Sequence, residues 1–124
     1  MNKDELHELA TMTEEELLSK LGRSIYLESA PGLGAKPPSV KKLIEIARQW
    51  LSDERVRLEK TVCRNKCIRD TVEADFSARQ KLIQVLIDSL SAAYTKLPLA
   101  TIAELLVRDG VKRFCRTIWA MDDT

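Results

Sequence analysis

The pentapeptide CRNKC, residues 63–67, is the stretch whose residue types could most readily do chemistry. Cys63 and Cys67 are two thiols four residues apart, and Arg64 and Lys66 flank them with positive charge. Thiolates bind metals and attack disulfides, and neighbouring cations favour the thiolate form. Residues four apart are neighbours on a helix surface, so we expect both thiols to face the same way.

The spacing of this pair does not favour a metal or redox site. A disulfide between side chains one helical turn apart would be strained, and a zinc ion would need two more ligands. The only other thiol and the only imidazole are Cys115 and His7, and neither has recognisable metal-ligand spacing. We therefore predict no metal and no cofactor. We interpret Cys63 and Cys67 as part of a contact strip that is more accessible than Cys115.

Catalytic motifs are missing from the sequence. It contains no GxxxxGK[ST], GxGxxG or HExxH pattern, so neither a phosphate-binding loop nor a zinc-protease helix is indicated. A Ser-His or Cys-His nucleophile would have to use His7, and no neighbouring residue is placed to orient that side chain. We predict that the chain has no catalytic residues and is not an enzyme.

The elements that must position the CRNKC strip are helices. The segment APGLGAKPPS, residues 30–39, is interpreted as a loop between an acidic helical head, residues 1–29, and a helical core, residues 40–121. In the core, apolar residues from Val40 to Val72 form one continuous stripe, which predicts a single long helix after residue 39. The residues SDE, 52–54, offer a fresh N-cap, so a break near Ser52 is the main alternative.

Further helices follow along the chain. The segment Phe76–Leu97 has a broad apolar face, which predicts a central helix, and TIAE, residues 101–104, has the spacing of a capping box that would open a short apolar helix. Cys115 and Trp119 lie on the apolar stripe of a last helix, where both are expected to be buried. No alternating β-pattern is present. We predict a single all-α domain, a bundle of about five to six helices.

Three local signals mark helix ends. Thr13 and Glu16 have capping-box spacing. Ser39 follows Pro38 as an expected N-cap, and Gly110 is expected to stop the helix before it. These signals predict where individual helices begin or end, independently of how the helices pack.

Charge is distributed unevenly, although the formal net charge is only +1. Residues 1–29 contain three basic and seven acidic residues, whereas residues 40–70 contain nine basic and five acidic residues. We expect the head to fold against the basic helix and neutralise it; the alternative is that the basic face meets an acidic partner.

These features favour a protein–protein interaction module whose partner is another protein or a second copy of the chain. The residues that we expect to contact that partner are Arg55, Arg57, Lys60, Cys63, Arg64, Lys66 and Cys67. The alternative is a small nucleic-acid-binding subunit that uses the basic helix 41–69. Against it, acids are interleaved with these bases, and stacking aromatic residues are missing from that face.

The segment LPLATIAELLVRDGVKRFC, residues 97–115, resembles part of the small α-helical accessory modules encoded beside effector enzymes in bacterial conflict and defence systems. RLEKTVC, residues 57–63, is similar in character to the same modules. The resemblance covers about a third of the chain. It implies an adaptor without catalysis, a small subunit of a defence complex whose partner is a co-encoded effector. It assigns no individual binding residue.

Compartment is predicted from the cysteines and from the apolar runs. Three cysteines is an odd number, which suits a reducing compartment better than a disulfide framework. No apolar run approaches the ~20 residues that a membrane span needs, and the polar amino terminus lacks the apolar region of a signal peptide. We predict a cytoplasmic protein without membrane contact.

Overall fold

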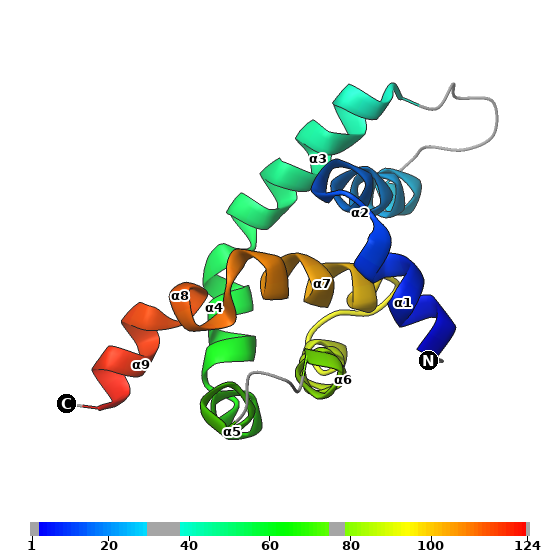
Figure 1. The fold of residues 1–124 in the computed structure, drawn as a ribbon. Coiled ribbons are helices and arrows are strands. Elements are labelled where there is room, and N and C mark those ends of the chain that lie inside the picture. The colour runs from blue at the N-terminus through cyan, green and yellow to red at the C-terminus, as the bar shows by residue number, and fades with distance from the viewer. Residues whose placement is uncertain (1–2, 30–37, 75–78, 124) are drawn as a thin grey trace.

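The computed structural model describes residues 3–29, 38–74 and 79–123, and in these ranges every regular element is a helix (Figure 1). The all-α prediction is therefore confirmed for the described ranges, which contain nine helices where about five to six were predicted. None of these helices is long and apolar enough to cross a membrane. The helices are α1 (Lys3–Thr11), α2 (Glu14–Ser29), α3 (Val40–Asp53), α4 (Arg55–Cys63), α5 (Lys66–Ala74), α6 (Arg79–Ser91), α7 (Leu99–Asp109), α8 (Val111–Phe114) and α9 (Arg116–Asp122).

The predicted long helix after residue 39 is wrong, because the segment is divided into α3, α4 and α5. The first break is at Glu54, two residues from the expected position, where φ is −93° and ψ is 2°. The second break follows Arg64, and there the Asn65 side chain accepts a hydrogen bond of 2.9 Å from the Cys67 amide. Asn65 thereby caps a new helix, and α5 turns away from the direction of α4 (Figure 1).

Most of the predicted helix ends are confirmed. Thr13 and Glu16 exchange hydrogen bonds, with the Thr13 amide donating to Glu16 Oε1 at 3.2 Å and the Glu16 amide donating to Thr13 Oγ1 at 3.1 Å. The Ser39 hydroxyl accepts from the Lys42 amide at 3.2 Å. Gly110 ends α7 with φ of 98°, a conformation that favours glycine.

The capping box predicted at residues 101–104 is wrong. Helix α7 begins at Leu99, with Pro98 at the N-cap position, so Thr101 and Glu104 lie inside the helix. Both side chains are buried. The residues 101–104 have the local pattern of a cap, but the helix starts before them. Pro98 is tolerated at the start of the helix because amide groups there have no acceptor within the helix.

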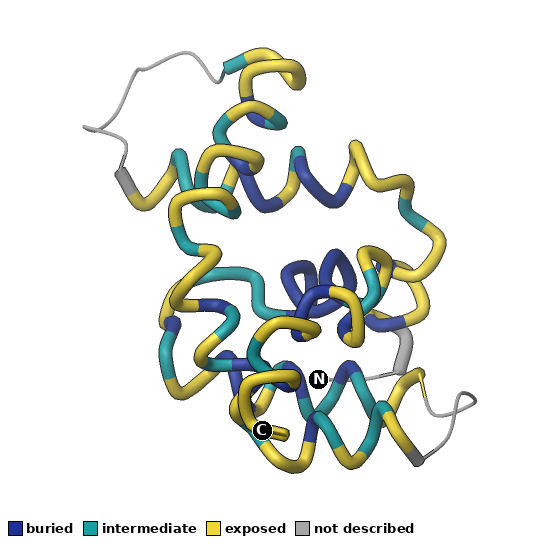
Figure 2. Tube along the Cα trace, turned by 90° about the vertical axis from the view of Figure 1, so that its left-hand side faces the viewer, coloured by how far each residue is buried: buried dark blue, intermediate teal, exposed yellow. Residues whose placement is uncertain are grey.

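Helix α7 lies at the centre of the fold, where the sequence placed the segment 76–97. All residues from Ala100 to Leu106 are buried, and α7 contacts α1, α2, α6 and α8. Figure 2 shows the buried residues gathered around this central part of the chain. In the segment 76–97, helix α6 ends at Ser91, and residues 76–78 lie outside the described ranges.

The acidic head joins the same hydrophobic core through α1 and α2. Leu9, Leu17 and Leu21 are almost fully buried in the cluster that contains the leucines of α6 and α7. Helix α2 also crosses α3 at close range, because a Cβ added to Gly22 would overlap the Leu43 carbonyl oxygen. The absence of a side chain at Gly22 thus lets the two helix backbones approach.

Candidate interaction surface

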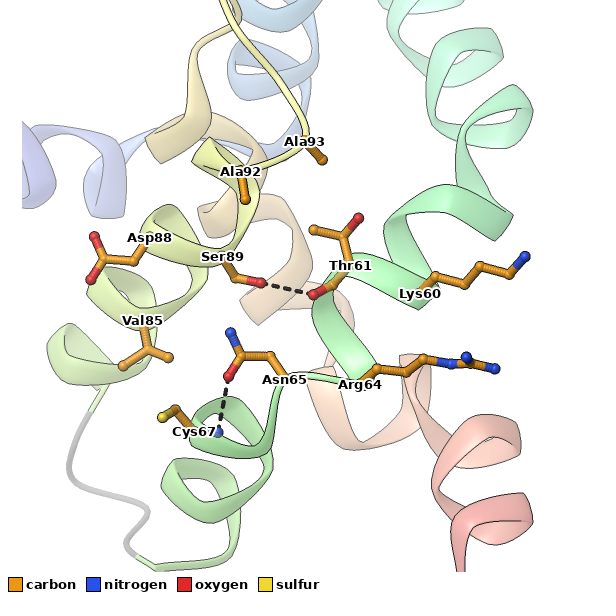
Figure 3. A pocket seen from close by; sticks show the side chains of 10 residues that line it. All are labelled: Lys60, Thr61, Arg64, Asn65, Cys67, Val85, Asp88, Ser89, Ala92 and Ala93. Atoms are coloured by element: carbon orange, nitrogen blue, oxygen red, sulfur yellow. Dashed lines mark hydrogen bonds between the residues drawn. The ribbon is translucent and has the colours of Figure 1, made fainter.

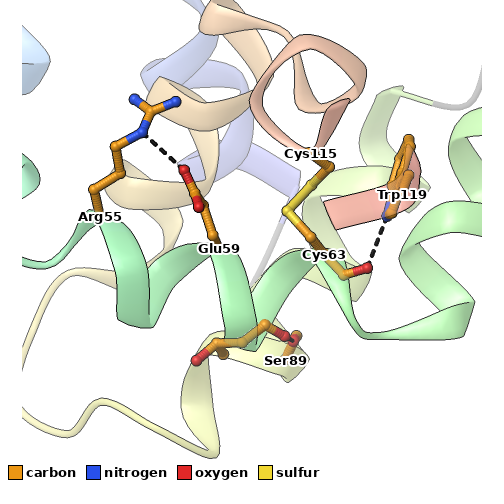
Figure 4. The surroundings of a disulfide bond; sticks show 7 residues. Arg55, Glu59, Cys63, Ser89, Cys115 and Trp119 are labelled. Carbon is orange, nitrogen blue, oxygen red and sulfur yellow. Dashed lines mark hydrogen bonds and ion pairs between the residues drawn. A yellow bond between two sulfur atoms is a disulfide. The ribbon is translucent and has the colours of Figure 1, made fainter. Parts of the chain in front are cut away.

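Cys63 and Cys67 do not share a surface strip, so this part of the prediction is wrong. Cys63 is only 3% exposed and forms a disulfide with the fully buried Cys115 (Figure 4). Cys67 is an exposed free thiol. Two causes act together. The break at Asn65 separates the cysteines into different helices, and the turn between α8 and α9 covers the side of α4 that carries Cys63.

Trp119 is buried, as predicted, and it is bonded to the end of α4. Its indole Nε1 donates a hydrogen bond of 2.7 Å to the Cys63 carbonyl oxygen (Figure 4). The Arg69 guanidinium lies 5.3 Å from the Trp119 ring centroid and donates to both carboxylate oxygens of Asp123 at 2.9 and 2.8 Å. The bonds to Arg69 lower the pKa of Asp123. These contacts fix α9 against the end of α4 and against α5.

Two of the predicted binding arginines contact their own chain. Arg55 donates to Glu59 at 2.8 Å and lies 5.1 Å from the Phe114 ring centroid. Arg57 donates to the Ala93 carbonyl at 2.8 Å and lies 4.8 Å from the Tyr94 ring centroid. Both guanidinium groups therefore help to attach α4 to other parts of the fold.

Tyr94, the aromatic partner of Arg57, is itself buried between α3 and α4. Its hydroxyl donates to Glu54 at 3.4 Å, and its ring meets Trp50 edge-on at a centroid distance of 5.5 Å. Burial, together with the nearby Glu54 charge, raises the pKa of Tyr94 to about 12. The tyrosine is thus neutral at ordinary pH and serves packing.

Lys60, Arg64 and Lys66 are exposed and form no ion pair with any residue that the structure describes. They follow one another from the last turn of α4 to the first turn of α5. Of the seven predicted contact residues, these three and Cys67 remain available to a partner.

A groove of about 640 Å³ lies between α4, the start of α5 and α6 (Figure 3). Its floor is held together by a hydrogen bond of 2.8 Å from the Ser89 hydroxyl to the Thr61 carbonyl. Figure 3 shows Lys60 and Arg64 pointing from α4 away from α6, and Asp88 pointing from α6 away from α4. The lining residues are Lys60, Thr61, Arg64, Asn65, Cys67, Val85, Asp88, Ser89, Ala92 and Ala93. The floor is thus made of small side chains, with positive charge along one rim.

A second groove, of about 570 Å³, was missed by sequence reasoning. It lies between α5 and the α8–α9 segment, and its lining includes four cations and two carboxylates. The two carboxylates, Glu73 and Asp123, are both bonded to Arg69. The remaining cations, Lys112, Arg113 and Arg116, come from the hexapeptide KRFCRT. This short run of cations is the feature of the sequence that indicates the groove. It was overlooked because the surrounding segment has nearly balanced charge.

A buried ion cluster was also missed. The Glu104 side chain is 1% exposed. Its carboxylate accepts a hydrogen bond of 3.0 Å from Arg79 Nη1 and another of 3.0 Å from Arg108 Nε. Burial would raise the pKa of Glu104, but the two guanidinium groups outweigh burial and lower it. Arg108 also donates to the Leu9 and Ala10 carbonyls at 3.2 Å. The cluster therefore joins α1, α6 and α7. Glu104 and Arg108 are four residues apart on one helix, a spacing that allows an ion pair, but nothing in the sequence pairs Glu104 with Arg79.

The expected neutralisation of the basic helix by the acidic head is not seen at three of the head's acids. Glu8, Glu14 and Glu15 are exposed, and none of them forms an ion pair with a residue that the structure describes. These three carboxylates thus remain on the surface.

No group of three or more potential metal ligands is present among the described residues. His7 is exposed on α1, far along the chain from both grooves. The cytoplasmic location stays a prediction, and the Cys63–Cys115 disulfide does not support it, because such bonds persist mainly in oxidising compartments. No protein-family model, curated protein or solved structure matches the chain.

Proposed function

We propose that the chain is a non-enzymatic protein–protein interaction module that binds an acidic segment of another protein in the α4–α6 groove. The observation that carries the proposal is the pair Lys60 and Arg64 at the groove, with Lys66 close by in the sequence. All three are exposed and form no ion pair among the described residues. These cations have no carboxylate partner among the described residues. An acidic segment can therefore bind them without breaking an ion pair between described residues of the chain.

The floor of the groove supports the same proposal. Ser89, Ala92 and Ala93 have small side chains, which allow the backbone of a partner segment to approach closely. Val85 offers an apolar contact beside them. Positive charge on the α4 rim and Asp88 on the α6 rim would orient a partner whose own charges are arranged in the opposite sense.

The proposal is tested by affinity capture from the native host with nuclease treatment, followed by mass spectrometry. We expect one stoichiometric protein partner, captured by the wild-type chain and lost when Lys60→Glu and Arg64→Glu are combined. The matched control combines Lys20→Glu and Arg23→Glu, which make the same charge change on exposed positions of α2. Equal capture by both double variants would contradict the proposed groove.

The accessory-module resemblance provides the first partner to test, a co-encoded effector protein. An adaptor role in a bacterial defence complex requires that this effector bind the chain directly. Purified effector that fails to bind the wild-type chain would refute that role. The groove proposal would remain testable with any other captured protein.

Nucleic-acid binding is the weaker alternative because several of the required bases contact their own chain. Lys42, Arg55 and Arg69 form ion pairs, and Arg57 is bonded to a backbone carbonyl. Generic RNA or DNA held by the free cations would bind with a log–log salt slope of about −0.7 to −0.9 per phosphate contact. We expect no measurable binding at physiological salt. Tight binding with that slope, abolished by the Lys60/Arg64 charge reversal, would favour the alternative.

A further inference from the structure

We propose that the groove between α5 and the α8–α9 segment binds the acidic corner of a second copy of the chain. We call this groove the tail groove and define its free cations as Lys112, Arg113 and Arg116. The acidic corner consists of Glu8 on α1 and of Glu14 and Glu15 in the first turn of α2. This contact is separate from the α4–α6 groove, so either proposal can fail without the other.

The tail groove is a surface with fixed geometry. The disulfide between Cys63 and Cys115 attaches the α8–α9 turn to α4, and the Trp119 indole bonds to the Cys63 carbonyl at 2.7 Å. On the opposite wall, Arg69 is bonded to Asp123 and Glu73. The backbone that carries the three free cations is therefore held in place before any partner arrives.

The groove carries surplus positive charge at its opening. Its two carboxylates are already bonded to Arg69, so they neutralise that residue and offer little to other cations. Lys112, Arg113 and Arg116 are exposed and have no ion-pair partner in the part of the chain that the structure describes. A complementary surface must therefore bring carboxylates.

The acidic corner is also firmly built. Thr13 and Glu16 cap α2 through their two reciprocal hydrogen bonds. Arg108 on α7 donates to the Leu9 and Ala10 carbonyls and so holds the end of α1. Glu8, Glu14 and Glu15 are thus presented on ordered helix ends.

The two surfaces are not paired within one molecule. Among the described residues, none of Glu8, Glu14 and Glu15 forms an ion pair with Lys112, Arg113 or Arg116. Figure 1 shows α1 and α9 on opposite sides of the fold, with the central helix α7 between them. A second copy can therefore bring its acidic corner to the tail groove without displacing a contact of the first. The net charge of +1 means that no strong overall repulsion keeps the copies apart.

Charge complementarity also selects this occupant over a nucleic acid. A phosphate backbone in the tail groove would run on beyond it, across a molecule that has nearly as many acids as bases. A second copy brings only a local cluster of carboxylates. Because the contacts are exposed ion pairs, the association is expected to be weak and sensitive to salt.

The experiment is analytical ultracentrifugation of nuclease-treated, oxidised protein over a range of concentrations. We expect the wild-type chain to self-associate at about 0.05 M salt, with a dissociation constant at least roughly tenfold higher at about 0.5 M salt. A head variant combines Glu8→Lys, Glu14→Lys and Glu15→Lys. A tail variant combines Lys112→Glu, Arg113→Glu and Arg116→Glu. Each alone is expected to be monomeric and to keep the helical circular dichroism of the wild type.

Combining both sets of changes in one chain provides the decisive measurement. The combined chain keeps the wild-type formal net charge of +1, and its reversed head is again complementary to its reversed tail. It is therefore expected to associate although neither variant does alone. A combined chain that stays monomeric would overturn the proposal, as would a wild-type chain that is monomeric at every concentration at low salt. Self-association that persists in both the head variant and the tail variant would place the contact elsewhere and would equally refute it. If a variant fails to fold, the salt dependence of the wild-type chain and the changes Glu15→Lys and Arg116→Glu, made singly and then combined in one chain, provide the test.

Discussion

The disulfide between Cys63 and Cys115 joins the end of α4 to the turn between α8 and α9, although the two residues are 52 positions apart in the sequence. The same junction contains the bond from the Trp119 indole to the Cys63 carbonyl. One small region therefore connects the central helices to the segment that carries Lys112, Arg113 and Arg116.

Removing this disulfide should destabilise the fold substantially. A crosslink that closes a loop of this length is expected to contribute about 4 kcal/mol by restricting the unfolded chain. We expect Cys63→Ser combined with Cys115→Ser to lower the free energy of unfolding in urea by about that amount. Cys67→Ser is the control, because Cys67 is exposed and free. Equal effects of the double change and the control would show that the disulfide does not stabilise the protein.

The cysteines should differ sharply in reactivity towards iodoacetamide. Cys67 is exposed, so we expect it to be alkylated in the native, non-reduced protein. Cys63 and Cys115 should react only after reduction and unfolding, since they are bonded to each other and buried. Peptide mass spectrometry of samples taken over time checks the order. Alkylation of Cys115 in native, non-reduced protein would contradict the pairing.

Trp119→Ala should cost roughly 3–5 kcal/mol, because it empties a buried aromatic site and leaves the Cys63 carbonyl without its indole donor. Trp119→Phe should cost less, since it keeps most of the buried ring. Thermal or urea unfolding measures both changes. A melting temperature for Trp119→Ala within a degree or two of wild type would show that α9 does not pack on α4.

The buried Glu104 cluster should make stability depend on acid pH. Its arginine partners lower the folded pKa of Glu104 below the unfolded value, so its contribution is present at neutral pH and is lost as pH falls through the folded pKa. We expect Glu104→Gln to destabilise by about 1–3 kcal/mol at pH 7 and by progressively less below about pH 4. Urea unfolding of both proteins across this range is the measurement. Glu45→Gln, at an exposed pair of 3.9 Å, should show no comparable trend.

Gly22→Ala should be destabilising, although alanine is ordinarily the better helix former. The added methyl group would overlap the Leu43 carbonyl oxygen and push α2 and α3 apart. We expect a loss of about 1–3 kcal/mol in urea unfolding. Arg23→Ala, at the exposed neighbouring position, should change stability by no more than about 0.5 kcal/mol. An equally stable Gly22→Ala protein would mean that the two helices are farther apart than the structure has them.

The helical class and several helix ends follow from the sequence, because each depends on residues within a turn or two of one another. The caps at Thr13, Ser39 and Gly110 are local hydrogen bonds or local backbone conformations, and sequence reasoning found all three. Burial of Cys115 and Trp119 was likewise predicted from a stripe with helical spacing. A stripe identifies the side of a helix that will be covered without identifying what covers it.

The partners of those buried residues were decided by the tertiary structure. A single residue at each break, Glu54 and Asn65, redirects the chain, and the direction of α4 and α5 then determines that Cys63 faces Cys115 while Cys67 faces solvent. Glu104 meets Arg79 only because α6 and α7 pack side by side. Contacts between residues 25 or 52 positions apart depend on helix packing, and that packing depends on the whole core at once. Local periodicity contains no such information, and so the two basic grooves could be located only after the helices had been placed.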